Sequence, residues 1–310
     1  MPSVAMIGAG LIGRSWAIVF ARAGWNVAIY DAASGASEKA LALIAEGLDE
    51  LAEQGLVSDA KAAAKRVRIA RDIIDALNDA EFVQESLPED LQTKIDVFGA
   101  LDAAAAPDAI LASSTSTIVA SKFTESLAGR VRCLVAHPVN PPHLVPLVEL
   151  VGAPWTSPET IARAKAVYEG IKQVPIVVKR EVDGFILNRL QAALLSEAFR
   201  LVGEGYVSPQ DCDKTIKDGL GLRWAFMGPF ETIELNAPGG IPDYCARYGP
   251  SLGRLQDGMG GSHVYRKENV DRIMAQWPLT PSGRKIADKM RWRDKRLAAL
   301  RVHKASQPES

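Results

Sequence analysis

Clusters of like charge are missing from this sequence. Its 310 residues carry a formal net charge of −1, and no block of five like charges occurs. Proteins that bind nucleic acid or an anionic membrane usually concentrate basic residues on one face or in one segment. We therefore expect neither nucleic acid nor a membrane among its partners, and a small molecule as its ligand.

Cysteine is also scarce. The three cysteines, Cys133, Cys212 and Cys245, lie far apart. An odd number at such spacing indicates neither a disulfide framework nor a zinc site. We therefore expect no bound metal, and a reducing compartment such as the cytoplasm.

No apolar run reaches the ~20 residues that a transmembrane helix needs. The richest run, residues 4–20, is interrupted by glycines, and the first basic residue, Arg14, lies inside it. A secretory signal places its positive charge before the apolar core, so we expect this run to belong to the folded protein. The sequence thus predicts a cytoplasmic protein.

Short apolar runs alternate with amphipathic segments through the first half of the sequence. This order predicts an α/β fold with a Rossmann-type, doubly wound and mostly parallel sheet. Helices are expected at 11–23, 38–54 and 91–104, and another where Ser157 and Pro158 form a start signal. Strands are expected at 4–7, 27–30, 67–70, 82–84, 110–112, 133–136, 144–151 and 175–178.

The pattern changes in the second half. The polar turn 179–184 ends the alternation, and residues 185–202 carry apolar side chains around most of a helix circumference. This predicts a helix buried at the centre of a second domain. The rest looks helical and ends in a basic stretch, 281–304, expected to be a solvated helix. We expect a Rossmann domain over residues 1–181 and an all-α domain over residues 182–310.

A glycine-rich turn, Gly8-Ala9-Gly10-Leu11-Ile12-Gly13, follows the first expected strand and opens the first expected helix. The first glycine allows the tight bend, the second lets a pyrophosphate approach the backbone, and the third lets helix and strand pack closely. Asp31 ends the next strand, where a carboxylate binds the adenosine ribose. Its charge would repel a 2′-phosphate, and residues 32–34 include no arginine, so the turn predicts NAD.

His137 is one of only four histidines and directly follows an apolar run. That places it at the carboxyl edge of the sheet, where open parallel sheets bind ligands and where a base could take a hydroxyl proton. Glu149, a carboxylate in an apolar stretch, could fix its tautomer if the chain between them doubles back. The residues alone leave open a histidine bonded to backbone and a glutamate on a solvated face.

Five motifs follow one another along the chain: residues 8–13, 113–117, 137–142, 147–149 and 184–190. Together they resemble the 3-hydroxyacyl-CoA dehydrogenase superfamily. The resemblance covers nearly the whole chain and is weakest near its C-terminal end. Residues 136–142, 188–191, 219–223 and 244–248 look most like its L-gulonate 3-dehydrogenase, or lambda-crystallin, branch.

The resemblance implies a role for each matching position. His137 corresponds to the catalytic base and Glu149 to its carboxylate partner, and Ser116 to a serine that hydrogen-bonds the substrate oxygen. Asn188, carried by the second domain, corresponds to an asparagine that helps to hold the substrate and the histidine. From the residues alone, Ser116 would be a turn serine and Asn188 a core asparagine with satisfied hydrogen bonds.

Glu89 and Lys94 match positions near the nicotinamide and its ribose. Without the resemblance they would be an acid at a helix start and a surface lysine. Arg223, beside Trp224, could clamp a substrate carboxylate through its planar fork, although a surface arginine at a helix end would look the same. The resemblance also implies a homodimer formed through the helical domain.

These features predict an NAD-dependent dehydrogenase that oxidises the 3-hydroxyl of a small 3-hydroxy acid. L-Gulonate is the first candidate substrate, L-carnitine the second because of residues 222–226, and a short 3-hydroxyacyl-CoA the third. A crystallin-like structural protein is the alternative outside the enzymes. The presence together of Ser116, His137, Glu149 and Asn188 argues against it.

Overall fold

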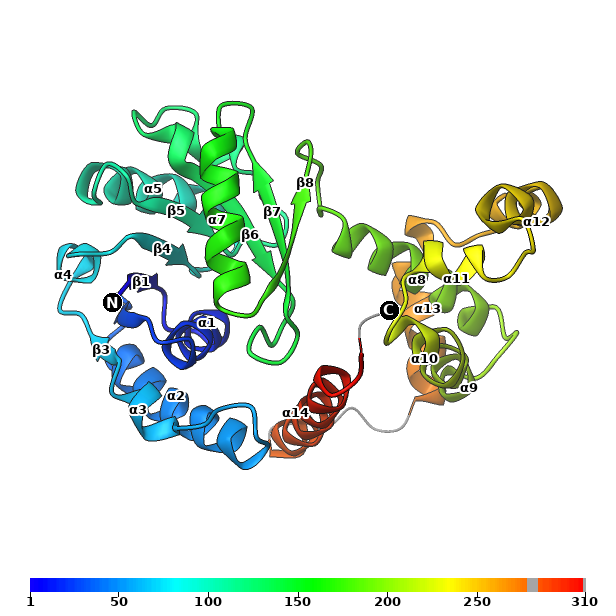
Figure 1. Cartoon of the computed structure of the whole chain (residues 1–310). Coiled ribbons are helices and arrows are strands. Elements are labelled where there is room, and N and C mark those ends of the chain that lie inside the picture. Colours follow the sequence, from blue (N-terminus) through cyan, green and yellow to red (C-terminus); the bar gives the residue numbers. More distant parts are fainter. Residues whose placement is uncertain (278–283, 309–310) are drawn as a thin grey trace. The chain divides into compact units, whose positions relative to one another are not determined.

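The computed structural model describes residues 1–277 and 284–308 (Figure 1). The chain forms two compact units. The first unit runs from Met1 to Asn188 and includes the C-terminal segment from Lys289, and the second runs from Arg189 to Asp288. The second unit thus starts later and ends earlier than the helical domain expected at 182–310.

An eight-stranded sheet organises the first unit, in the order β3-β2-β1-β4-β5-β6-β7-β8. All neighbouring strands are parallel except β6 and β7. This confirms the doubly wound, mostly parallel sheet. The order reverses between β1 and β4, and ligands of such sheets bind at the carboxyl ends beside that point. The strands are β1 (Ser3–Ile7), β2 (Asn26–Tyr30), β3 (Val67–Ile69), β4 (Phe82–Glu85), β5 (Ile110–Ser113), β6 (Cys133–Pro138), β7 (Leu147–Gly152) and β8 (Val174–Val178).

Several helices of the first unit begin at a residue whose side chain caps them. The Asp90 side chain accepts from the Thr93 N–H at the start of α5, and Ser157 accepts from the Thr160 N–H at the start of α7. Each cap satisfies one of the N–H groups that a helix start leaves free. The helices are α1 (Leu11–Arg22), α2 (Ala36–Glu53), α3 (Ala60–Ala64), α4 (Ile73–Leu77), α5 (Leu91–Ala104), α6 (Ser121–Thr124) and α7 (Pro158–Gly170).

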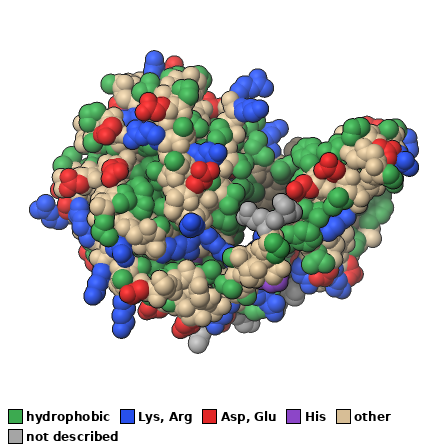
Figure 2. Space-filling view, viewed as in Figure 1, with side chains coloured by type: hydrophobic (Ala, Val, Ile, Leu, Met, Phe, Trp, Pro, Cys, Tyr) green, Lys and Arg blue, Asp and Glu red, His purple; other side chains and the backbone are tan. Residues whose placement is uncertain are grey.

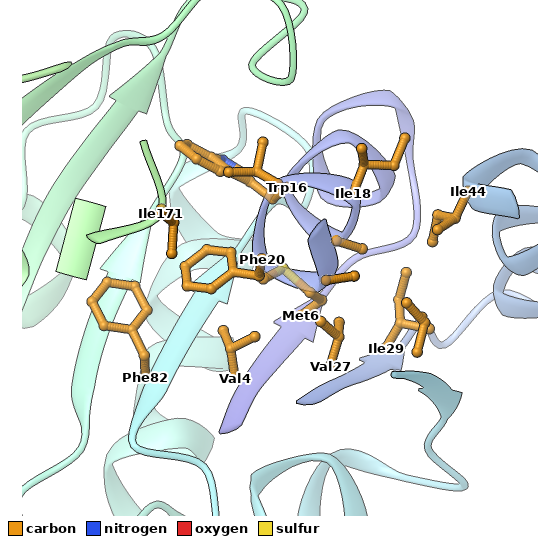
Figure 3. Packing of buried hydrophobic residues seen from close by; sticks show 14 of the residues in the cluster. Val4, Met6, Trp16, Ile18, Phe20, Val27, Ile29, Ile44, Phe82 and Ile171 are labelled. Carbon is orange, nitrogen blue, oxygen red and sulfur yellow. The ribbon is translucent and has the colours of Figure 1, made fainter. Parts of the chain in front are cut away.

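Both faces of the sheet are covered, which explains its nearly continuous apolar strands. On one face Trp16 and Phe20 of α1 pack over Met6 of β1 and Phe82 of β4, all fully buried (Figure 3). Burying a side chain of this size contributes about 1.5–3 kcal/mol. A second cluster, which includes Phe98 of α5, covers the other face. This packing fixes the strand ends that carry the site.

The C-terminal helix α14 (Arg284–Ala305) packs with the first unit. Ala298 is buried in the core cluster of this unit, and Arg301 donates to the backbone oxygens of His143 (3.0 Å) and Lys172 (3.1 Å). Most of its other side chains are exposed, as the basic composition predicts. Leu297 also packs against this cluster. These few contacts make no amphipathic pattern along the helix, so the sequence did not reveal the docking. Residues 281–283 of the expected helix lie outside the described residues.

The second unit is helical, as expected. The prediction that its first helix, α8, is buried at the centre of the domain is wrong for the isolated chain: Leu190 is 64 % exposed, and only Val202 and Gly203 are buried. The described helices of this unit leave its apolar side chains largely uncovered. Of the helices described in either unit, none is long and apolar enough to cross a membrane. The helices here are α8 (Leu187–Gly203), α9 (Pro209–Lys214), the π-helical turn Thr215–Leu220, α10 (Gly221–Trp224), α11 (Pro229–Glu234), α12 (Gly240–Gln256) and α13 (Lys267–Gln276).

Candidate active site at the carboxyl edge of the sheet

The glycine turn between β1 and α1 has the geometry that the sequence predicts. Gly8 has a φ of +103°, and a Cβ at Gly13 would lie 1.9 Å from the backbone oxygen of Gly8, so both positions exclude a side chain. A Cβ at Gly10 would meet no atom within 4 Å. The protein itself therefore does not require glycine at position 10, whereas a phosphate approaching the backbone would.

The start of α1 is open to an anion. Its N-cap, Gly10, provides no side-chain hydrogen bond, and the first turn holds no acidic residue. Leu11 is exposed at this end and Ile12 is half-buried. Free N–H groups and the positive end of the helix dipole favour a phosphate at this point. The turn fits the pyrophosphate of a dinucleotide.

Asp31 follows β2 and holds the glycine turn. Its Oδ2 accepts from the backbone N–H of Ala9 at 2.8 Å, and its Oδ1 accepts from Ala33 at 2.9 Å. A carboxylate has about four acceptor sites, so capacity for a ribose hydroxyl remains. Its role as the ribose ligand stays a prediction.

His137 and Glu149 face each other across the antiparallel pair β6 and β7. The chain doubles back as the sequence required, and the Nδ1 of His137 lies 2.7 Å from Oε2 of Glu149. Glu149 is fully buried, which rules out the solvated strand face. Its Oε1 accepts from the backbone N–H groups of Ile186 (2.8 Å) and Leu187 (2.9 Å) at the start of α8. Both carboxylate oxygens are thus occupied.

These contacts set the charge of the pair. Burial by itself would raise the pKa of Glu149, but the hydrogen bonds from His137, Leu187 and Ile186 outweigh it and hold the pKa below the ordinary carboxyl value. The group is therefore ionised at neutral pH, and a carboxylate at Nδ1 keeps the proton of the neutral imidazole on that nitrogen. Nε2 is left as the nitrogen that can accept a proton.

Ser116 and Asn188 are brought together beside this edge. Ser116 lies in the loop that follows β5, and Nδ2 of Asn188 donates to its backbone oxygen at 3.0 Å. Asn188 is the last residue of the first unit, so this hydrogen bond lies within one compact body. The expectation that Asn188 is carried by the second domain therefore needs correction. The chain from Gly184 to Asn188 folds with the first unit because Glu149 holds the amides of Ile186 and Leu187.

Glu89 and Lys94 occupy different environments. Glu89 is exposed and accepts hydrogen bonds from the loop after β5, including Thr115 and Thr117. Lys94 is buried. It is therefore not a surface lysine, and its ammonium has no direct access to a ligand. Its Nζ donates to Oε1 of Glu85 (2.7 Å) and to the backbone oxygen of Leu87 (3.1 Å). Lys94 thus holds the loop after β4.

Glu85 is a residue that the sequence reasoning missed. It ends β4, is fully buried, and accepts from the Leu87 N–H and the Ser113 hydroxyl, each at 2.5 Å, besides the Lys94 ammonium. An acid at the end of an apolar strand was the signal that singled out Glu149, and the same signal could have found Glu85. Together with Glu89 it joins the loops after β4 and β5.

Arg223 belongs to the second unit. It is exposed near the end of α10, which is also what a surface arginine at a helix end would show. The residues assembled at the sheet edge all come from the first unit. A role of Arg223 in binding substrate stays a prediction.

The fold and this edge define the class of protein. Residues 3–182 match the NAD-binding domain of 3-hydroxyacyl-CoA dehydrogenase, and residues 184–277 match its C-terminal domain. The chain belongs to the 3-hydroxyacyl-CoA dehydrogenase family, whose members are NAD-dependent dehydrogenases. The glycine turn, the open start of α1 and the Asp31 carboxylate fit that cofactor.

Within this family, the chain is similar to proteins of more than one name. The chain is 40 % identical to the lambda-crystallin homolog of Rattus norvegicus over 302 residues, covering 96 % of this chain and 94 % of that protein. It is 38 % identical to an L-carnitine dehydrogenase of a Pseudomonas species, covering 96 % of this chain and 92 % of that protein. Among solved structures, an NAD-dependent 5-formyl-3-hydroxy-2-methylpyridine-4-carboxylic acid 5-dehydrogenase superposes with a TM-score of 0.86 and 28 % identity, over 99 % of this chain and 100 % of that one.

Proposed function

We propose that this enzyme oxidises the 3-hydroxyl of a small 3-hydroxy acid to the 3-keto acid, with His137 as the general base. The observation that supports it most directly is the contact of 2.7 Å between His137 and the buried, ionised Glu149 at the end of β6. A base needs a proton-accepting nitrogen whose charged form is stabilised, and this pair provides both.

The reaction requires loss of a hydride and a proton from the carbinol. NAD, when bound, supplies the hydride acceptor. Nε2 of His137 takes the hydroxyl proton, and the charge of Glu149 stabilises the imidazolium that forms. Ser116 and Asn188 orient the substrate oxygen, and the hydrogen bond of 3.0 Å from Asn188 to the Ser116 backbone oxygen keeps the two in register. The C–O single bond becomes a carbonyl.

For the cofactor, the same edge offers separate contacts. The turn formed by Gly8, Gly10, Leu11, Ile12 and Gly13 would hold the pyrophosphate, because its free amides and helix dipole favour negative charge. Asp31 would accept from the adenosine ribose. Glu89 would reach the nicotinamide ribose, with Lys94 acting only through the loop after β4.

L-Gulonate is the preferred substrate because the similarity to the lambda-crystallin homolog extends over nearly the full length of both proteins. L-Carnitine is the second candidate, favoured by the relative named for it. A short 3-hydroxyacyl-CoA is the third. Arg223 would bind the carboxylate of a free acid, so Arg223→Met should raise the KM for L-gulonate about 10-fold or more. An unchanged KM would remove Arg223 from the site.

A substrate screen tests the function. NADH formation is followed by its absorbance with L-gulonate, L-carnitine and 3-hydroxybutyrate as substrates. His137→Gln should lower kcat on the order of 100-fold or more while NADH binding stays nearly unchanged. Equal turnover in that variant would rule out His137 as the base. A chain that served only as a structural protein would bind NADH and oxidise none of the three.

Homodimer formation through the helical unit is the second part of the proposal. Hydrophobic side chains reach the surface of its helices (Figure 2). Leu222, Phe226, Phe230 and Leu235 are each at least 65 % exposed. Monomeric proteins rarely leave so many large apolar side chains in water. Light scattering should give the mass of a dimer, and Phe230→Glu should shift it towards the monomer.

The three free cysteines support a cytoplasmic location.

A further inference from the structure

The carboxylate of Glu89 gathers the loop that follows β5. Its Oε1 accepts from the hydroxyl of Thr115 at 2.5 Å and from both the hydroxyl and the backbone N–H of Thr117 at 2.9 Å. The N–H of Ser116 lies 3.1 Å from Oε1 and 3.2 Å from Oε2, and that of Ile118 lies 3.3 Å from Oε1. One side chain from the loop after β4 thus binds consecutive residues of the neighbouring loop.

These contacts depend on negative charge. Although the Glu89 side chain is exposed, the partial loss of water around its carboxylate would by itself raise the pKa, but hydrogen bonds from Thr115, Thr117 and Ser116 outweigh this and hold the pKa below the ordinary carboxyl value. The ionised group only accepts hydrogen bonds, which suits a loop that presents only donors to it. A glutamine here would have one acceptor atom and would turn an NH2 group towards the Ser116 N–H.

The backbone of Ser116 is held on both sides. Glu89 binds its N–H, and Asn188 donates to its oxygen at 3.0 Å. Ser116 and Asn188 are the two residues assigned to the substrate oxygen. A change in the position of this peptide would therefore move both groups together.

We propose that Glu89 is the positioning residue for Ser116 and Asn188: it fixes the loop after β5 so that both side chains meet the substrate oxygen beside His137. The inference rests on the proposed function and assigns to Glu89 a task separate from holding a ribose. A ribose ligand acts on cofactor affinity, whereas a positioning residue acts on the rate once cofactor is saturating.

Steady-state kinetics separates the two tasks. Glu89→Gln should lower kcat at saturating NAD by at least about 10-fold, because a misplacement of about 1 Å costs on the order of 100-fold in rate. The control is Asp96→Asn on the exposed face of α5, where the carboxylate accepts a hydrogen bond from Gln92. The control should keep the kcat of the unmodified enzyme. An unchanged kcat in Glu89→Gln with a raised KM for NAD would overturn the proposal in favour of a ribose ligand alone.

A double-mutant cycle with Ser116→Ala tests the route of the effect. If Glu89 acts through Ser116, Glu89→Gln should lower kcat by less than about 3-fold in the Ser116→Ala background. Equal fold-losses in both backgrounds would overturn the link. Glu89→Asp keeps the charge on a shorter side chain and should retain more activity than Glu89→Gln. It replaces that variant in the cycle if the glutamine protein does not fold.

Hydrogen exchange gives a readout that needs neither substrate nor cofactor. In the ligand-free protein, the amides of Ser116, Thr117 and Ile118 should exchange at least about 10-fold faster in Glu89→Gln, while exchange across β1 stays unchanged. Unaltered exchange at these amides would refute the role of Glu89 in the loop. If no hydroxy acid is oxidised, the proposed function fails, and faster exchange would still show that Glu89 holds the loop.

Discussion

Replacing Lys94 by methionine should destabilise the first unit strongly. The Lys94 ammonium lies 2.7 Å from Glu85, and the two side chains are 1 % and 0 % exposed. Methionine keeps most of the volume and removes the charge, so the Glu85 carboxylate would stay buried without its cation. Removing one partner of a buried ion pair costs about 3–5 kcal/mol. The lost hydrogen bond to the Leu87 oxygen is part of that cost.

A second substitution shows that the cost comes from the charge. In Lys94→Met with Glu85→Gln no charge remains buried at this position, and the glutamine oxygen can still accept from Ser113. The double variant should therefore be more stable than Lys94→Met by about 2 kcal/mol. Urea unfolding followed by tryptophan fluorescence and far-UV circular dichroism gives both values. Lys39→Met, exposed on α2, is the matched control. A cost for Lys94→Met no larger than that of the control would refute the reasoning.

Gly10→Ala should fold normally but bind NADH at least about 10-fold more weakly, because a Cβ there meets no protein atom within 4 Å and occupies the path of a phosphate. Gly13→Ala should lower the melting temperature instead, since its Cβ would lie 1.9 Å from the Gly8 oxygen. Calorimetric titration measures NADH binding and thermal unfolding measures stability. Equal effects of the two substitutions on both measurements would contradict this division of roles between Gly10 and Gly13. Burial and the nearby charge of Arg22 lower the pKa of His143 from 6.5 to about 4. Because the unfolded chain binds this proton more readily, the stability it contributes is complete above pH 6.5 and is lost as pH falls towards 4, by up to about 3 kcal/mol. His143→Gln should flatten urea-derived stability between pH 7 and 5, and an unchanged slope would exclude His143 as the source.

The alternating pattern of the first half was sufficient to predict every strand of the sheet. Few other folds accommodate short β-branched runs that alternate with amphipathic segments. The glycine turn located the edge of the sheet at which ligands bind. The pairing of His137 with Glu149 was one of the alternatives that the residues left open, since a carboxylate in an apolar strand favours a partner, and the family resemblance decided for it. These predictions depend on local pattern and on one buried charge, both visible in the sequence.

Burial against a particular neighbour was harder to predict. The apolar circumference of α8 indicated that something covers this helix, but the pattern does not say what, and in the single chain Leu190 is exposed. Lys94 looked like a surface residue because its partner, Glu85, comes from another element. The docking of α14 depends on Ala298, Leu297 and the backbone acceptors of Arg301, which leave no trace in the composition.

The return of α14 to the first unit makes the helical unit an insertion in the chain. The first unit is discontinuous in sequence, and both ends of the second unit are covalently joined to it. Cutting the chain after α13 would therefore remove Ala298 from the core of the nucleotide-binding unit and free the His143 carbonyl from Arg301. A C-terminal deletion should thus loosen the most distant part of the sequence, the unit that begins at Met1.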